Sequence, residues 1–209
     1  MKQILVSIFL LTFLLSTGCY YNSNPTEIKI SLEERIHCDK GYQNYGAEIK
    51  KQAKRFNLPP EYLMSLVMLE CSGEENPKSR FEKSIFNKLD EVKKGKRKSF
   101  ENITKEDLKD ASKEALENLS TSWGPFQIMG YKSIHLGIKI KELRGTVGKG
   151  EIYWGVKWIR DNYGEYLDRG DFESAFRIHN TGSPTGKTHD KNYVYNGLRY
   201  AAYFKSRYW

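Results

Sequence analysis

The stretch "NLPPEYLMSLVMLECSG", residues 57–73, predicts a helix with one face against the core of the protein. Pro60 stands near the first turn, where the missing N–H of a proline costs little, and Gly73 is a suitable stop. Leu63, Leu66 and Val67 lie at i, i+3 and i+4, a spacing that places them on one side of a helix.

One acidic residue, Glu70, is out of place in this helix because it lies at i+7 from Leu63 and so shares the aliphatic face. It is also near the helix C-terminus, where the macrodipole opposes negative charge, so burial and dipole both favour the neutral acid. A carboxylic acid that is still protonated near neutral pH is what general-acid cleavage of a glycosidic bond requires. The alternative is a boundary glutamate that turns to solvent or pairs with a lysine, and the pattern alone favours that alternative.

A second unusual stretch is "TSWGPFQIMG", residues 121–130. Gly124 lets the backbone approach a flat ligand closely, and Pro125 is expected to start a helix. In the first turn of that helix, Gln127 offers a donor and an acceptor to a sugar or its N-acetyl group. The alternative, equally compatible with the local chemistry, is a tight turn before a core helix.

Helical periods continue through most of the remaining chain, so we expect a mainly α protein. In "ITKEDLKDASKEALENLS", residues 103–120, Thr104 is the expected N-cap, with Asp107 completing a capping box. No convincing run of alternating strands is present, although a small β-hairpin has room near residues 134–146. The expected helices cover residues 46–55, 57–73, 103–120, 151–164, 171–180 and 192–204. In the helix over residues 151–164, an apolar stripe at helical spacing is formed by Ile152, Val156, Ile159 and Tyr163.

The N-terminus has the pattern of a bacterial lipoprotein signal peptide, with Lys2, an apolar run over residues 4–15 and "STGC" before Cys19. Ser16 stands where an aliphatic residue is more usual, so a plain signal peptide or an uncleaved anchor are the alternatives. We expect lipidation of Cys19 and a periplasm-facing domain held at a membrane of the bacterial cell envelope. The expected segments are a signal peptide (1–18), a tether and N-terminal arm (19–45) and one catalytic domain (46–209).

The net charge of +8 is compatible with an anionic partner such as nucleic acid, membrane or cell-wall polymer, and equally with a solvated surface. Arginine is not clustered with aromatic residues on any expected helix, so we expect no nucleic-acid partner. Cys38 and Cys71 remain after Cys19 is lipidated, and they are either a disulfide or two buried free thiols. The four histidines show no metal-ligand spacing, and we expect no metal and no other cofactor.

Three motifs in this order resemble the lysozyme-like superfamily, above all soluble lytic transglycosylases and goose-type lysozymes. They are "ECSG" (70–73), "SWGPFQIM" (122–129) and "HNTG" (179–182). "SRFEKSIF" (79–86) and "SWGPFQIMG" are also similar to phage-type N-acetylmuramidases, and the resemblance covers about residue 58 to the C-terminus. Two residues depart from the transglycosylase pattern, since Cys71 replaces a serine and His179 replaces a tyrosine. As a lone histidine, His179 is otherwise a packed or capping residue.

The resemblance implies a lysozyme-like helical domain that binds peptidoglycan glycan strands. Glu70 then protonates the oxygen between N-acetylmuramic acid and N-acetylglucosamine, and as a base takes the proton from the muramoyl 6-hydroxyl, which leaves an anhydro-muramic end. A hydrolase instead needs a second carboxylate, for which Glu82 is the first candidate, with Asp171 behind it, although Glu82 could also simply pair with Arg80 or a lysine. The implied substrate-binding residues are Ser122, Trp123, Gln127, Met129, His179, Asn180 and Tyr195.

Several functions therefore remain open at the level of sequence. The leading hypothesis is a lipid-anchored murein lytic transglycosylase, and a muramidase that hydrolyses the same bond is the nearest alternative. A catalytically silent lipoprotein that binds cell wall or a host ligand is an alternative from another class. A membrane-perturbing or nucleic-acid-binding protein has only the net charge in its favour.

Overall fold

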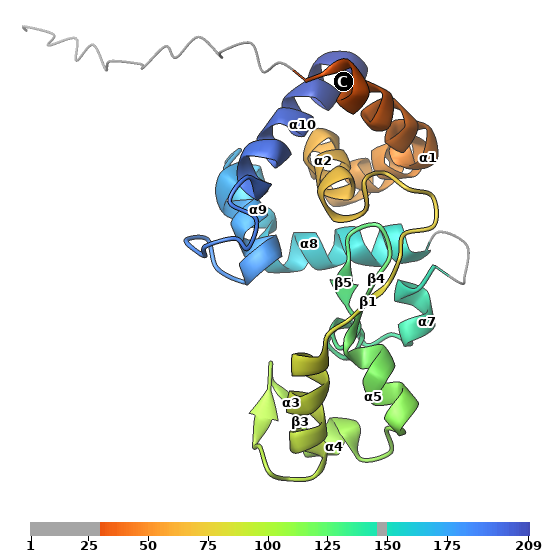
Figure 1. The fold of residues 1–209 in the computed structure, drawn as a ribbon, viewed down its shortest axis with the longest axis vertical. Helices are drawn as coiled ribbons and strands as arrows, with labels where there is room; N and C mark the ends of the chain where they lie inside the picture. The colour runs from red at the N-terminus through yellow and green to blue at the C-terminus, as the bar shows by residue number, and fades with distance from the viewer. Residues whose placement is uncertain (1–29, 146–149) are drawn as a thin grey trace, which may run out of the picture.

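The computed structural model describes residues 30–145 and 150–209, and within these ranges the protein is mainly helical, as expected (Figure 1). The expected signal peptide, the lipidation at Cys19 and the start of the tether lie outside the described residues. The helices are α1 (Leu32–Phe56), α2 (Pro60–Cys71), α3 (Lys83–Lys93), α4 (Lys105–Leu108), α5 (Lys113–Leu119), α6 (Lys132–Leu136), α7 (Ile140–Leu143), α8 (Gly150–Asp168), α9 (Phe172–Thr181) and α10 (Tyr193–Tyr208). The strands are β1 (Arg80–Phe81), β2 (Ser99–Phe100), β3 (Ile103–Thr104), β4 (Thr121–Trp123) and β5 (Ile128–Met129). In the part of the chain that is described, no helix combines the length and the apolar composition needed to cross a membrane.

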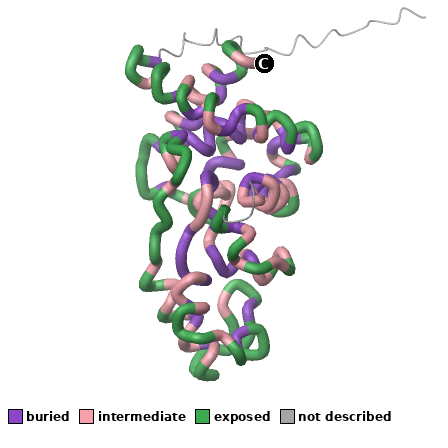
Figure 2. Tube along the Cα trace, turned by 90° about the vertical axis from the view of Figure 1, so that its right-hand side faces the viewer, coloured by how far each residue is buried: buried purple, intermediate pink, exposed green. Residues whose placement is uncertain are grey.

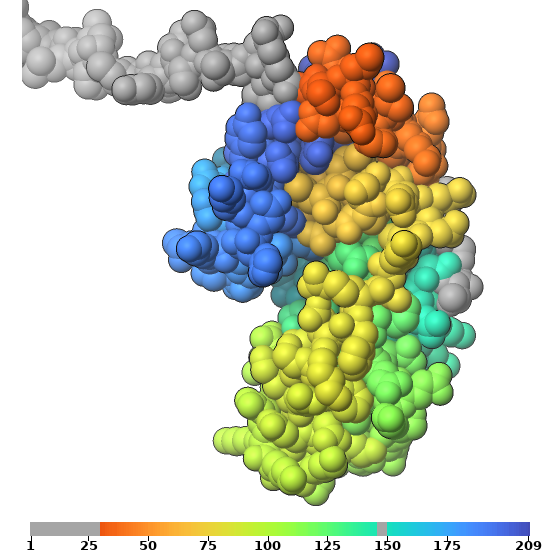
Figure 3. All heavy atoms as spheres, in the orientation of Figure 1, coloured from red at the N-terminus to blue at the C-terminus, as the bar shows by residue number. Residues whose placement is uncertain are grey.

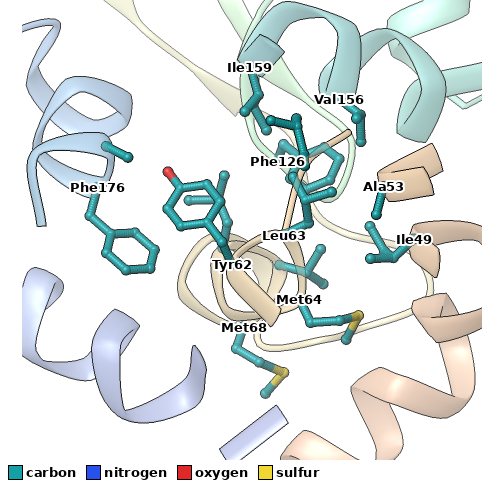
Figure 4. Close-up of a cluster of buried hydrophobic side chains, with 14 of the residues drawn as sticks. Ile49, Ala53, Tyr62, Leu63, Met64, Met68, Phe126, Val156, Ile159 and Phe176 are labelled. Carbon is teal, nitrogen blue, oxygen red and sulfur yellow. The ribbon is translucent and has the colours of Figure 1, made fainter. Parts of the chain in front are cut away.

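Helix α2 is the centre of the larger of two hydrophobic clusters, and every residue from Tyr62 to Met68 is buried. Side chains from α1, α8 and α9 and from the turn between β4 and β5 surround it (Figure 4). Pro60 stands in its first turn, so the expected core helix is confirmed. The helix ends where Ser72 adopts the left-handed conformation, and Gly73 follows with φ +71° against Gly41, whose Cα would lie 2.6 Å from an added Cβ.

Helix α1 corrects the expected domain boundary. It begins at Ser31, whose hydroxyl accepts from the Glu34 amide at 3.2 Å while the Glu34 carboxylate accepts from the Ser31 amide at 2.8 Å. This is a capping box, and the helix then runs without a break to Phe56. The predicted boundary between residues 45 and 46 therefore falls inside a helix and is wrong. Gly41 and Gly46 interrupt the apolar period, yet both are buried in the packed helix.

The stretch 121–130 forms a β-hairpin instead of a loop followed by a helix. Strands β4 and β5 pair antiparallel, with Ser122 opposite Met129, and β1 adds a third strand on the other side of β4. Pro125 stands in the turn between β4 and β5, so the expectation that it starts a helix is wrong. Gly124 and Gln127 have φ values of +70° and +47°, which the turn requires. The small hairpin expected near residues 134–146 is also wrong, because α6 and α7 occupy the described part of that range.

A second, smaller hydrophobic cluster joins α3, α4, α5 and the strand pair β2–β3. These elements lie below the three-stranded sheet in Figure 1, and Figure 2, turned by 90°, shows buried segments in the same lower part of the molecule. The expected capping box is present, since Asp107 accepts from the Thr104 amide at 2.8 Å. The single helix predicted over residues 103–120 is nevertheless two helices, because the Ser112 hydroxyl accepts from the Ala115 amide at 3.0 Å and caps a new one.

The C-terminal helices agree with the sequence prediction. Helix α8 buries its predicted stripe of Ile152, Val156, Ile159 and Tyr163, each at most 2% exposed. Gly155 lies on the same helix, and a Cβ there would approach the Phe126 ring to 2.4 Å. The ring of Phe126, in the β4–β5 turn, therefore packs directly against the backbone of α8, which joins the hairpin to the larger cluster.

We predict that Phe126→Ala lowers the free energy of unfolding by about 3–5 kcal/mol, because it leaves a cavity between the hairpin and α8. Phe126 is 1% exposed, whereas Phe81 in the same sheet is 47% exposed and provides a matched control. Phe81→Ala should cost about 1 kcal/mol or less. Urea denaturation monitored by circular dichroism measures both, and equal losses in the two variants would contradict this role of Phe126.

Candidate functional site

Glu70 lies in the last turn of α2, and its side chain is 17% exposed. Its Oε1 atom accepts a hydrogen bond from the hydroxyl of Tyr193 on α10, and His179 Nε2 on α9 lies 3.8 Å from the same oxygen. The predicted partial burial is therefore confirmed. The contacts described for its carboxylate come from a phenol and an imidazole.

His179 is held as a neutral imidazole by hydrogen bonds to both ring nitrogens. Its Nε2 lies 3.0 Å from the carbonyl oxygen of Phe126, which can only accept, so Nε2 carries the proton. Its Nδ1 then accepts from the hydroxyl of Tyr163 at 2.7 Å. Burial lowers the pKa of His179, and the nearby Glu70 carboxylate opposes this only in part. His179 therefore stays uncharged at neutral pH, and its two hydrogen bonds hold the ring in place beside Glu70.

Three buried tyrosines, Tyr62, Tyr163 and Tyr193, share this region of the core. Burial is the main cause that raises the pKa of each phenol, and the negative charge of Glu70 adds to the effect. All three therefore remain protonated at neutral pH and keep their hydroxyl protons for hydrogen bonds. Together with His179 they give Glu70 a surrounding of neutral polar groups.

Sequence reasoning selected Tyr195 as a ligand residue, but the tyrosine that contacts Glu70 is Tyr193. Tyr195 is 62% exposed and lies beneath the Arg199 guanidinium, 5.5 Å from its ring centroid. The signal for Tyr193 was present in the sequence, because it shares the helical period of the buried residues Gly197, Ala201 and Phe204. Tyr62 and Tyr163 likewise occupy core positions of α2 and α8.

A cleft of about 470 Å³ lies next to this site, between the α8–α9 side and the hairpin side of the molecule. In Figure 3 the surface is hollowed between the blue C-terminal segment and the yellow-green segment below it. Four of the predicted residues line the cleft, namely Gln127, Met129, His179 and Asn180. Glu70 is not itself in the lining, but His179 and Tyr163 are, so the cleft ends at the groups that surround the carboxylate.

The amide of Gln127 is committed to bonds within the protein. Its Oε1 accepts from the hydroxyl of the buried Ser122 at 2.7 Å, and its Nε2 donates to the carbonyls of Gly124 at 3.0 Å and Lys78 at 3.2 Å. These bonds brace the hairpin turn against the segment before β1. Ser122 thus holds the side chain of Gln127 in position at the cleft. The amide of Gln127 already has partners within the protein, so its described contacts are structural.

Trp123 faces a different pocket, which it lines together with Gly124 and Arg144. Its Nε1 donates to the carbonyl of Asn118 at 2.9 Å, and the Arg144 guanidinium lies 4.6 Å from its ring centroid. The structure therefore does not bring Trp123 into the cleft. The tryptophan that does line it is Trp158, on α8, which sequence reasoning missed because it lies beside the apolar stripe and not within a motif.

The two acids considered as a second carboxylate have other partners. Glu82 pairs with Arg80 at 2.6 Å, which is the alternative that the sequence left open, and Asp171 caps α9 by accepting from the Ser174 amide at 3.0 Å. Hydrogen bonds from Ser174 lower the pKa of Asp171. The carboxylate in the lining of the cleft is instead Glu101, in the β2–β3 turn.

The predicted disulfide is not formed, since Cys38 and Cys71 are both free thiols. Cys71 Sγ donates to the carbonyl of Val67 at 3.3 Å, so the thiol closes on its own helix. Burial raises the pKa of Cys38 to about 12 and that of Cys71 to about 11. Both groups are therefore protonated and poorly nucleophilic at neutral pH.

Over residues 30–145 and 150–209, no three His, Cys, Asp or Glu side chains come together as ligands for a metal ion. Comparison of the chain with protein-family models, curated proteins and solved structures found no match. The chemistry of the Glu70 site is therefore the basis on which a function can be proposed.

We predict that neither Cys38 nor Cys71 reacts quickly with iodoacetamide in the folded protein at about pH 8, because the thiolate is the reactive form. Both should be alkylated rapidly after unfolding without reductant, as measured by mass spectrometry of the two cysteine peptides. Ser84→Cys, at an exposed helical position, gives a control thiol that reacts in the folded state. Resistance of both native cysteines in the unfolded, non-reduced chain would show a disulfide and contradict the structure.

Proposed function

We propose that this protein cleaves the glycan strand of peptidoglycan, with Glu70 as the acid that protonates the oxygen between N-acetylmuramic acid and N-acetylglucosamine. The observation that carries the proposal is one partly buried carboxylate at the end of the central helix, which accepts a hydrogen bond from Tyr193 and lies 3.8 Å from His179, a residue of the cleft lining. Tyr193 and His179 both approach Oε1, which leaves Oε2 as the oxygen to hold the transferable proton.

The lining of the cleft supports a carbohydrate ligand. Trp158 offers an aromatic face for the apolar side of a sugar ring, while Asn162 and Asn180 offer amides for hydroxyl and acetamido groups. The motifs around Glu70, the hairpin and His179 also occur in the order found in lysozyme-like enzymes. We therefore propose a lysozyme-like arrangement in which α2 supplies the acid and the hairpin and α9 supply the walls of the cleft.

The arrangement favours a lytic transglycosylase over a hydrolase. In the first step Glu70 gives its proton to the leaving 4-oxygen of N-acetylglucosamine as the glycosidic bond breaks. In the second, the Glu70 carboxylate takes the proton from the muramoyl 6-hydroxyl, whose oxygen attacks the anomeric carbon and closes an anhydro ring. The proton returns to Glu70, no water is consumed, and one carboxylate is sufficient. The hydrogen bond from Tyr193 stabilises the ionised form between the two steps.

A muramidase is the second candidate, because Glu101 lines the same cleft and could orient a water. The ion pair of Glu82 with Arg80 and the capping bond of Asp171 speak against those two acids in that role. We further propose that the first residues of the chain anchor the enzyme through lipidated Cys19, facing the periplasm, since peptidoglycan lies there.

We predict that Glu70→Gln lowers the rate of wall cleavage by about 10²-fold or more, because the nearly isosteric amide cannot give up an acidic proton. The rate of release of soluble muropeptides from purified sacculi measures the effect. Glu75→Gln, at an exposed position four residues beyond the helix end, serves as the control and should keep the wild-type rate. A Glu70→Gln variant that cleaves at nearly the wild-type rate, with an unchanged circular dichroism spectrum, would refute the role of Glu70.

We also predict that the released disaccharide-peptides carry anhydro-muramic ends and that Glu82→Gln leaves the rate within a few-fold of wild type. Each product should then be one water lighter than its hydrolytic counterpart and inert to borohydride, as mass spectrometry before and after reduction would show. Reducing muramic ends would instead place the protein among the muramidases, with Glu70 still the acid. In that case Glu101→Gln and Glu82→Gln would identify which acid orients the water.

A further inference from the structure

The cleft contains a charged pair that the proposed cleavage reaction does not use. Lys132 begins α6, directly after the hairpin, and its Nζ lies 3.2 Å from Oε2 of Glu101 in the β2–β3 turn. The same Nζ lies 4.6 Å from the ring centroid of Trp158 and 4.7 Å from that of Tyr131. All four residues line the cleft.

Lys132 is held in place more firmly than a surface lysine. Its side chain is 18% exposed, and two aromatic faces and one carboxylate restrict its movement. A restrained ammonium loses less side-chain entropy when it binds a ligand, and it has three N–H donors, of which Glu101 needs only one. The ammonium of Lys132 can therefore donate to a second acceptor, such as a ligand carboxylate, while it keeps its contact with Glu101.

Among the described residues that line the cleft, Lys132 is the one lysine or arginine and Glu101 is the one carboxylate. The ring of His135 lies against Trp158, with centroids 6.3 Å apart, and its burial and the charge of Lys132 lower the pKa of His135. His135 is thus neutral at neutral pH, and Lys132 carries the positive charge of this end of the cleft.

The N-acetylated sugar rings have no charge to match this cation, whereas the lactyl branch of a muramoyl residue carries carboxylates, either on the bare lactyl group or on the peptide attached to it. We propose that Lys132 binds a carboxylate of the attached peptide, so that the cleft favours strands whose peptides carry free carboxylates. The inference rests on the proposed function, and it adds a recognition site at Lys132 to the cleavage site at Glu70.

The simplest competing explanation is that Lys132 and Glu101 only bridge α6 to the β2–β3 turn. The two explanations differ in what Glu101→Gln does. If the pair is a bridge, Glu101→Gln and Lys132→Met both loosen the cleft and weaken every ligand alike. If Lys132 recognises a carboxylate, Glu101→Gln removes a competing acceptor and keeps or increases the preference for the probe with free carboxylates.

The test measures binding in the Glu70→Gln background, so that a cleavable ligand persists, by isothermal titration calorimetry. The probes are short soluble glycan strands with their tetrapeptides and the same strands with the peptide carboxylates converted to amides. The background protein should bind the probe with free carboxylates about tenfold more tightly, the size of one charge-assisted contact. Lys132→Met should abolish this difference, and Glu101→Gln should retain or increase it. Lys139→Met, at an exposed lysine outside the cleft, is the matched control and should change neither affinity.

Equal affinity of the background protein for the two probes, or no binding of either, would overturn the proposal. So would equal weakening of both probes by Lys132→Met, or a loss of preference in Glu101→Gln that matches the loss in Lys132→Met. Failure of the proposed function is read separately, since a wild-type protein that releases no muropeptides from sacculi can still show the binding preference.

Discussion

Burial of α2 on all sides is the constraint on which the rest of the structure depends. Every residue of this helix from Tyr62 to Met68 is buried, so the helix is enclosed by α1, α8, α9, α10 and the hairpin turn. Glu70 stands at the end of this buried stretch, where it contacts Tyr193 and lies 3.8 Å from His179, which lines the cleft.

The hairpin turn connects the core to the site through a single residue. The ring of Phe126 fills the space that Gly155 leaves on α8, and its carbonyl accepts the Nε2 proton of His179. The packing of the Phe126 ring therefore determines which nitrogen of His179 carries the proton, because the ring fixes the position of the Phe126 carbonyl. Gln127, next in the chain, braces the same turn through Ser122 and the carbonyl of Lys78. Ser122 and Gln127, which the motif predicts as substrate-binding residues, therefore mainly hold the hairpin turn in place.

The two ends of the cleft differ in their electrostatics. Around Glu70 the partners are neutral, because burial keeps the tyrosines protonated and His179 unprotonated. Such an environment suits a carboxyl group that must exchange a proton and exist in two charge states. At Lys132 and Glu101 the side chains are charged and partly open to solvent, which suits recognition of a charged substituent. In our proposal, Glu70 at one end of the cleft cleaves the glycan, and Lys132 at the other end binds the peptide carboxylate.

The sequence by itself determined the features that depend on residues close together in the chain. The period of Leu63, Leu66 and Val67 predicted the core helix and the half-buried Glu70, and the stripe on α8 and the Thr104 capping box were also correct. The length of α1 was missed although its capping box was readable, because Gly41, which helps to break its pattern, is packed against Met68 and Gly73 far along the chain.

Only the tertiary structure decided the features that depend on distances between remote segments. Strand β4 pairs with Arg80 and Phe81 of β1 as well as with β5, and no period within residues 121–130 reports the partner from β1. The same holds for Tyr193 on Glu70, for Lys132 on Glu101 and for the free thiols of Cys38 and Cys71, since each joins or separates groups from different elements. The periodicity of a segment indicates which of its faces is buried. Which other segment covers that face depends on how the whole chain packs.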